Sequence, residues 1–160
     1  MSDNAAPNLQ QTAIAFLEQD EITRSQILRE HGIARYTFLT KMQVNQANII
    51  CVMRYLENPS KLKFPNLVGA DLSGLILDGV TLIRGNLSYA NLSNSSLVNA
   101  DLLFANLTGT DLRSCNLEGA TLNETIWQDA LVTDCQLGVS IGLTSMQRQD
   151  LQMRGAVFSK

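Results

Sequence analysis

Residues 100–119 read ADLLF, ANLTG, TDLRS and CNLEG in succession, four five-residue units with leucine at the third position of each. The same spacing extends in both directions, so that leucine occupies every fifth position from Leu62 to Leu122. In a helix each residue turns by about 100°, so residues five apart would be scattered around all sides. In a strand, residues five apart would lie on alternate faces. The backbone must therefore turn within each unit and point every leucine at a shared axis. This pattern predicts a β-solenoid with very short sides.

The positions around each leucine agree with this interpretation. Two residues before leucine the side chain is often small, which suits a second inward position. The residue directly before leucine is Asn, Asp, Ser or Thr in ten of the eleven units from Leu72 to Leu122. Short polar side chains of this kind bond to turn backbone and face water. Two residues after leucine, several units have glycine or asparagine, which tolerate positive φ at a corner.

The units ADLSG at 70–74 and ANLSN at 90–94, with the four quoted above, resemble the pentapeptide repeat family, whose unit reads Ala, Asp or Asn, Leu and two variable residues. The resemblance covers roughly residues 60–140. It implies a mainly β fold, a right-handed quadrilateral β-helix (the repeat-five-residues fold) of about four coils. Stacked coils would be about 4.8 Å apart, the spacing of neighbouring strands. After Leu122 the inward positions hold Trp127, Val132 and Leu137, which we interpret as a degenerate terminal coil.

The segments on either side of the repeats are predicted to be helical. We expect an N-terminal helical unit over 1–58, the solenoid over 59–141, and a capping helix with a tail over 142–160. The N-terminal unit would cover the open edge of the first coil, which a solenoid must protect. The C-terminal helix would begin at the capping box formed by Thr144 and Gln147.

Four helices are expected within the N-terminal unit. The apolar spacing from Leu9 to Leu17 predicts the first. A capping box of Thr23 and Gln26 would start the second, and Gly32 would stop it. A third is expected over 34–42, and a fourth over 45–58, where Pro59 follows.

A coil of twenty residues aligns side chains that are twenty positions apart. Ile83 lies twenty residues before Leu103, and Phe64 lies forty before Phe104. One outer face therefore gathers an apolar set with Tyr89 beside it: Phe64, Ile83, Leu103, Phe104 and Tyr89. Such a patch marks a contact surface or ground covered by another part of the chain. We interpret the protein as a scaffold that binds another protein through its outer faces, and a second copy of the chain is a further candidate partner.

Composition points away from several other functions. The 160 residues have a net charge of −3, and no secretory signal or long apolar run is present, so we expect a soluble cytoplasmic protein that does not contact a membrane. The single histidine, His31, has no nucleophile motif beside it. We expect no catalytic activity, no cofactor, no metal and no small-molecule substrate. Cys115 and Cys135 are twenty apart and are interpreted as buried thiols serving as small apolar side chains.

Two alternatives involve DNA. Residues 26–42 resemble a helix-turn-helix, in which Arg35, Tyr36, Thr37 and Lys41 would contact DNA. Residues 9–57 hold five basic and five acidic residues, however, and this neutral balance is a poor match to the phosphate backbone. The second alternative comes from the family resemblance, because some pentapeptide repeat proteins mimic DNA and bind DNA gyrase. Residues 59–137 have a net charge of −4, far from the roughly 11 charges on duplex DNA of equal length.

Overall fold

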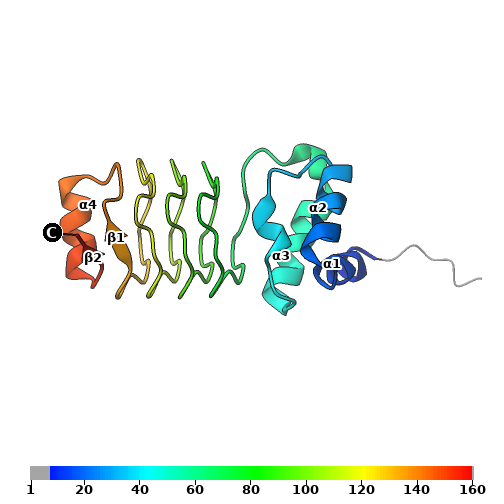
Figure 1. The fold of residues 1–160 in the computed structure, drawn as a ribbon, viewed down its shortest axis with the longest axis horizontal. Coiled ribbons are helices and arrows are strands. Elements are labelled where there is room, and N and C mark those ends of the chain that lie inside the picture. The colour runs from blue at the N-terminus through cyan, green and yellow to red at the C-terminus, as the bar shows by residue number, and fades with distance from the viewer. Residues whose placement is uncertain (1–7, 160) are drawn as a thin grey trace, which may run out of the picture. The chain divides into compact units, whose positions relative to one another are not determined.

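The computed structural model describes residues 8–159. The chain divides into two compact units, Met1–Leu62 and Lys63–Lys160, and each is described here by itself. The first contains helices, and the second contains the repeats (Figure 1).

The first unit is built from three α-helices and two short 3-10 helices. In chain order these are α1 (Leu9–Leu17), α2 (Glu21–Glu30), η1 (Thr37–Thr40), α3 (Gln46–Glu57) and η2 (Pro59–Lys61). Its core contains a cluster of three aromatic rings, Tyr36, Phe38 and Tyr55, whose centroids lie 5.0 to 5.9 Å apart. The expected helices over 9–17 and 45–58 are confirmed, the latter shorter by one residue at each end.

The start of α2 differs from the sequence-based expectation. Asp20, rather than Thr23, is the N-cap, and its carboxylate accepts a hydrogen bond of 2.7 Å from the Thr23 N–H. Asp is at least as good an N-cap as Thr, and its charge also complements the helix dipole. The predicted capping box of Thr23 and Gln26 was therefore wrong. The stop was right, because α2 ends at Glu30 and Gly32 adopts a φ of 72°.

The helix expected over 34–42 is absent, and the chain makes only the single turn η1. The physical reason is burial, because Phe38, Leu39 and Thr40 are consecutive and all buried, whereas a helix packed by one face would turn at least one of them outward. Arg24 reaches this segment from α2 and anchors it. Its guanidinium donates to the carbonyl oxygens of Leu39, Thr40 and Met42 at 3.3, 3.3 and 2.7 Å. Further bonds join it to the carbonyls of Leu17 and Gln19. These bonds hold the backbone on either side of Lys41 in its observed path.

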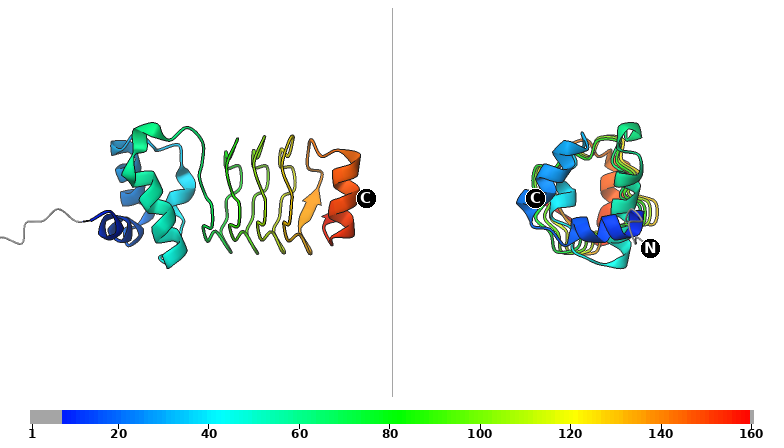
Figure 2. Two further views of the ribbon diagram at one scale, coloured as in Figure 1. Left: turned by 180° about the vertical axis from the view of Figure 1, so that it is seen from behind. Right: turned by 90° about the vertical axis from the view of Figure 1, so that its right-hand side faces the viewer.

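The second unit is a solenoid of stacked twenty-residue coils. Parallel bridges join each residue before a leucine to its counterpart twenty positions later, from Asn66↔Asn86 to Thr121↔Ile141. Among the described residues these bridges form four columns, which start at Asn66, Asp71, Ile76 and Thr81. Figure 2, seen end-on, shows the traces of successive coils lying over one another. Most strand positions are single bridges because the backbone turns in every unit.

The solenoid core contains two inward side chains from each unit. The leucines of the repeat are buried, as are the small residues two positions before them, such as Ala70, Ala90 and Ala105. Trp127, Val132 and Leu137 are buried at the equivalent positions of the last coil, as expected. Cys115 and Cys135 are buried free thiols, and Ser95 Oγ lies 3.5 Å from Cys115 Sγ. These side chains provide the apolar burial that holds the coils together.

A helix and a short strand close the C-terminal end of the second unit. Helix α4 (Ser145–Met153) follows strand β1 (Gln136–Gly138), and β2 (Val157–Phe158) then pairs in parallel with β1 (Figure 1). The predicted capping box of Thr144 and Gln147 is confirmed. Arg154 fixes the helix to the last coil by donating to the carbonyls of Trp127 and Ala130, both at 3.1 Å.

Candidate interaction surface

The corners of the solenoid are turns whose third residue has a left-handed backbone. In the first such turn Ala70 N–H donates to the Leu67 carbonyl, and Gly69 has a φ of 68°. A type II turn requires positive φ at this position, which glycine and asparagine tolerate best. Most corners have Gly, Asn, Asp or Ser. Four corners instead have longer side chains in the left-handed conformation. Three of them, Arg84, Tyr89 and Phe104, with φ of 57°, 61° and 60°, are aromatic or lie against aromatic rings, and the fourth is Glu124 at 58°.

The Arg84 side chain contacts two aromatic rings. Arg84 and Phe104 occupy the same corner of successive coils, and Phe64, twenty residues before Arg84, lies just before the first bridged residue of the solenoid, Asn66. The guanidinium carbon of Arg84 lies 4.5 Å from the centre of the Phe104 ring and 5.7 Å from that of Phe64. Both distances fall within the range of cation–π attraction. The rings remain accessible, with 44% of Phe104 and 50% of Phe64 exposed.

Ile83 and Leu103 lie beside these residues. Each directly precedes a corner residue and is half-buried. Their coils are joined by the Arg84 N–H, which donates to the Leu103 carbonyl at 2.8 Å. The structure thus places four of the predicted patch residues around Arg84. Sequence reasoning missed Arg84 itself, although its spacing of twenty from both Phe64 and Phe104 was available as a signal.

Tyr89 occupies the next corner along the chain after Arg84. Its side chain is 68% exposed and lies over Gly109, one coil further on. A Cβ added to Gly109 would lie 2.5 Å from the Tyr89 ring, so this glycine leaves the room that the ring needs. We call the whole set the aromatic face: Phe64, Ile83, Arg84, Tyr89, Leu103 and Phe104.

The side of the solenoid between these two corners has its polar groups bonded internally. Asn86 Oδ1 accepts from the Ser88 N–H and hydroxyl, at 3.1 and 2.7 Å. Asn106 repeats this arrangement with Thr108 one coil later, at 3.0 and 2.6 Å. The polar groups are therefore occupied within the turn. The features that remain available to a partner are the rings and the Arg84 guanidinium.

The residues proposed for DNA contact have different structural roles within the first unit and do not form one exposed surface. Tyr36 is only 3% exposed and belongs to the aromatic core. Arg35 stacks on Tyr36 at 4.5 Å and donates to the Leu62 carbonyl at 2.9 Å. Lys41 forms an ion pair with Glu21 at 3.6 Å. Of the four, Thr37 and Lys41 are exposed without a role in the core, and η1 offers only one helical turn to a groove.

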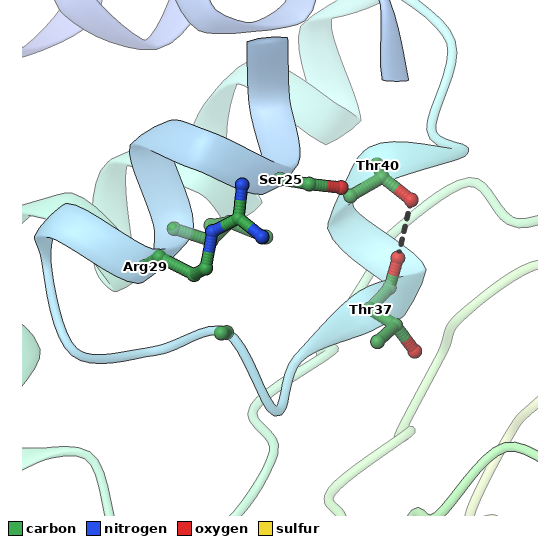
Figure 3. A pocket seen from close by; sticks show the side chains of 6 residues that line it. Ser25, Arg29, Thr37 and Thr40 are labelled. Atoms are coloured by element: carbon green, nitrogen blue, oxygen red, sulfur yellow. Dashed lines mark hydrogen bonds between the residues drawn. The ribbon is translucent and has the colours of Figure 1, made fainter. Parts of the chain in front are cut away.

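A pocket of about 210 Å³ lies between α2 and η1. Figure 3 shows Ser25, Arg29, Thr37 and Thr40 around it, with the Thr40 hydroxyl bonded to the Thr37 carbonyl at 2.7 Å. Leu28 and Ala34 complete the lining. Arg29 is the one titratable residue of this lining, so the pocket holds no acid/base pair. Within residues 8–159 no helix is long and apolar enough to cross a membrane.

Comparison with protein-family models identifies the repeats. A model described as pentapeptide repeats matches residues 76–114 and 86–123, with eight copies of the unit. Residues 76–123 are pentapeptide repeats. The helices of the first unit form an N-terminal extension to these pentapeptide repeats. The repeats account for the stacked coils, while the handedness and the number of coils stay predictions. The comparison with curated proteins found no match.

Several solved structures of pentapeptide repeat proteins resemble part of the chain. A protein from the thylakoid lumen of Arabidopsis thaliana is 27% identical, with 51% of this chain and 56% of that chain covered and a TM-score of 0.49. HetL, involved in heterocyst differentiation regulation in the cyanobacterium Nostoc sp. strain PCC 7120, is 35% identical, with 44% and 37% covered and a TM-score of 0.28. A protein from the cyanobacterium Cyanothece 51142 is 30% identical, with 49% and 57% covered and a TM-score of 0.31. The chain spans less than two thirds of the length of each.

Proposed function

We propose that this protein is a non-enzymatic scaffold that binds another protein through the aromatic face of its solenoid. The observation that carries the proposal is the set of bulky residues at left-handed corners, Arg84, Tyr89 and Phe104. A bulky side chain is rare in this conformation and strains the backbone. Of the other corners, 69, 74, 79, 109 and 119 have Gly, and six have Asn, Ser, Asp or Glu.

Exposure supports the same proposal. Phe64, Tyr89 and Phe104 are between 44% and 68% exposed, so they gain little from folding by burial. Aromatic residues and arginine are enriched at the centres of protein interfaces, where water is excluded when the partner docks. A strained backbone that supports half-exposed rings is therefore better explained by contact with a partner than by folding alone.

The test compares two doubly substituted proteins in affinity capture from native lysate. Ile83→Lys with Leu103→Lys places two charges on the aromatic face. Ser73→Lys with Ser93→Lys is the matched control, because these residues occupy the equivalent positions of another side and are also half-buried. A partner bound by the unmodified protein and by the control, but not by the Ile83 and Leu103 variant, supports the proposal. Nuclease treatment should leave the binding unchanged.

Stability measurements accompany the capture, since a lysine at a half-buried position can also unfold the protein. If the Ile83 and Leu103 variant unfolds, the milder variant Phe104→Gly replaces it, because glycine suits the left-handed corner. Equal capture by all of these proteins would overturn the proposal. Nuclease-sensitive capture of nucleic acid that is independent of the aromatic face would also overturn it and would direct attention to the first unit.

A further inference from the structure

The Arg84 guanidinium is the polar centre of the aromatic face. Phe64 lies one coil before it and Phe104 one coil after it, so the two rings occupy opposite sides of the guanidinium along the solenoid axis. Within residues 8–159 the Arg84 side chain has no ion pair and donates no hydrogen bond. Its N–H groups are therefore held between two apolar surfaces and have no acceptor in the described part of the chain.

Two of the other three arginines of the second unit, Arg113 and Arg154, have carboxylate partners. Arg113 donates to Asp111 through two nitrogens, at 3.0 and 2.7 Å, and this lowers the pKa of the Asp111 carboxyl. Arg154 also donates through two nitrogens, at 3.1 and 2.8 Å, and both bonds go to Asp150 Oδ2. The two-nitrogen pairing with a carboxylate is the preferred geometry of the guanidinium group. Arg84 is arranged differently, with two rings where these arginines have acids, whereas Arg148 stacks on the single ring of Phe158 at 4.5 Å.

A partner carboxylate would complete this arrangement. Arg84 is exposed, so a partner can reach its guanidinium. When the partner docks and excludes water, an ion pair formed there is screened less than one in open solvent. The rings also hold the side chain in place, so less freedom is lost when the partner binds. Beside the carboxylate, apolar side chains of the partner would cover the exposed parts of Phe64 and Phe104, with Ile83 and Leu103 next to them.

The charge of the second unit favours a single carboxylate over a polyanion. Residues 63–160 contain nine acidic and six basic residues, and 6 − 9 gives a net charge of −3. Nucleic acid would be repelled by this balance, because its binding depends on neutralising many phosphates. One Asp or Glu among apolar residues needs only the one cation that the face supplies.

We propose that Arg84 binds an aspartate or glutamate side chain of the partner protein, flanked by apolar residues that pack on Phe64 and Phe104. This inference rests on the proposed function and specifies the chemistry of the partner. It makes Arg84 the residue that selects a carboxylate, and it makes the two rings the residues that position Arg84.

The test uses peptide probes and the NMR signals of the arginine Nε–H groups. The first probe is the acetylated, amidated peptide Ser-Leu-Glu-Leu-Ser, and the others replace its glutamate with glutamine or phosphoserine. We expect the glutamate peptide to shift the Arg84 signal saturably and the glutamine peptide to bind at least tenfold more weakly. Arg84→Gln should remove this preference. Arg148→Gln is the control, because Arg148 also stacks on a ring, that of Phe158 at 4.5 Å.

Three results would overturn the inference: equal binding of the glutamate and glutamine peptides, a preference that survives Arg84→Gln, or no saturable shift at roughly 10 mM peptide. Tighter binding of the phosphoserine peptide would assign the site to phosphate instead. Failure here is distinguishable from failure of the proposed function. If a lysate partner is lost with Ile83→Lys and Leu103→Lys but is still captured by Arg84→Gln, that result supports the scaffold function and contradicts the carboxylate contact of Arg84.

Discussion

The Arg84 guanidinium and the Phe104 ring, which lie one coil apart, stack at 4.5 Å from corners that both have left-handed backbone. A left-handed conformation costs a residue other than glycine about 1 kcal/mol or more. The cation–π contact returns about 0.5–1 kcal/mol at an exposed site. Two such corners together cost about 2 kcal/mol or more, which exceeds what the contact returns. The pair therefore adds nothing to stability on its own, and its arrangement is better explained by binding.

Phe104→Gly should separate folding from binding. Glycine relieves the left-handed strain and removes the ring, so the two effects oppose each other and the free energy of unfolding should stay within about 1 kcal/mol of that of the unmodified protein. Urea unfolding measures this value. Capture of the partner should be lost. A loss of several kcal/mol would show instead that the ring is part of the folded core.

Gly74→Ala and Gly109→Ala should differ in their effect on the neighbouring coil. Both glycines have positive φ, 68° and 63°, so each substitution should lower the free energy of unfolding by about 1 kcal/mol. The new Cβ of Gly74→Ala would have no atom within 4 Å. The new Cβ of Gly109→Ala would collide with the Tyr89 ring. NMR signals of the Tyr89 ring should move only in Gly109→Ala. Unchanged Tyr89 signals in that variant would contradict the packing described here.

Arg24→Gln should destabilise the first unit strongly. The Arg24 side chain is 8% exposed and donates to five backbone carbonyls, most of which would lose their partner. Hydrogen bonds from a charged group and their unsatisfied acceptors indicate a loss of roughly 3 kcal/mol or more. Circular dichroism of the helices during denaturation measures it. Arg29→Gln, five residues along α2 at an exposed position, is the control and should stay within about 0.5 kcal/mol.

Cys51 should make stability depend on pH in the alkaline range. Burial raises the pKa of its thiol to about 12 from an ordinary 9.0. Above pH 9 the unfolded chain therefore loses this proton while the folded protein keeps it. Ionisation of the Cys51 thiol should leave the free energy of unfolding unchanged below pH 9 and should lower it as the pH rises from 9 towards 12. Cys51→Ala should reduce the slope of unfolding free energy against pH, and an unchanged slope would contradict the assignment.

Much of the second unit could be predicted from one periodicity. The five-residue spacing of leucine fixed the direction of each side chain, and a coil of twenty residues followed from the resemblance to a known family. The alignment of Phe64 with Phe104 then follows from their separation of forty residues. The same count would have placed Arg84 between them and Tyr89 over Gly109. The apolar pattern does not indicate these contacts, because one member of each pair is a cation or a glycine.

The first unit was harder to predict because its decisive contacts are distant in sequence. Arg24 bonds to the carbonyl of Met42 across eighteen residues, and no local pattern indicates that the backbone of 39–42 will meet a guanidinium. Local propensity therefore predicted a helix over 34–42 where tertiary bonding produced a single turn. The N-cap of α2 was a smaller error of the same region, since Asp20 and Thr23 are both acceptable capping residues.

The most direct test of the central claim is site-specific photo-crosslinking from the aromatic face. Benzoylphenylalanine at position 104 keeps an aromatic group at the corner, and the same residue at position 114 occupies an exposed left-handed corner on another side. We expect a covalent adduct with a partner protein from position 104, none from position 114, and loss of the adduct when Ile83→Lys and Leu103→Lys are added. Equal adducts from both positions, or no adduct from position 104, would contradict it.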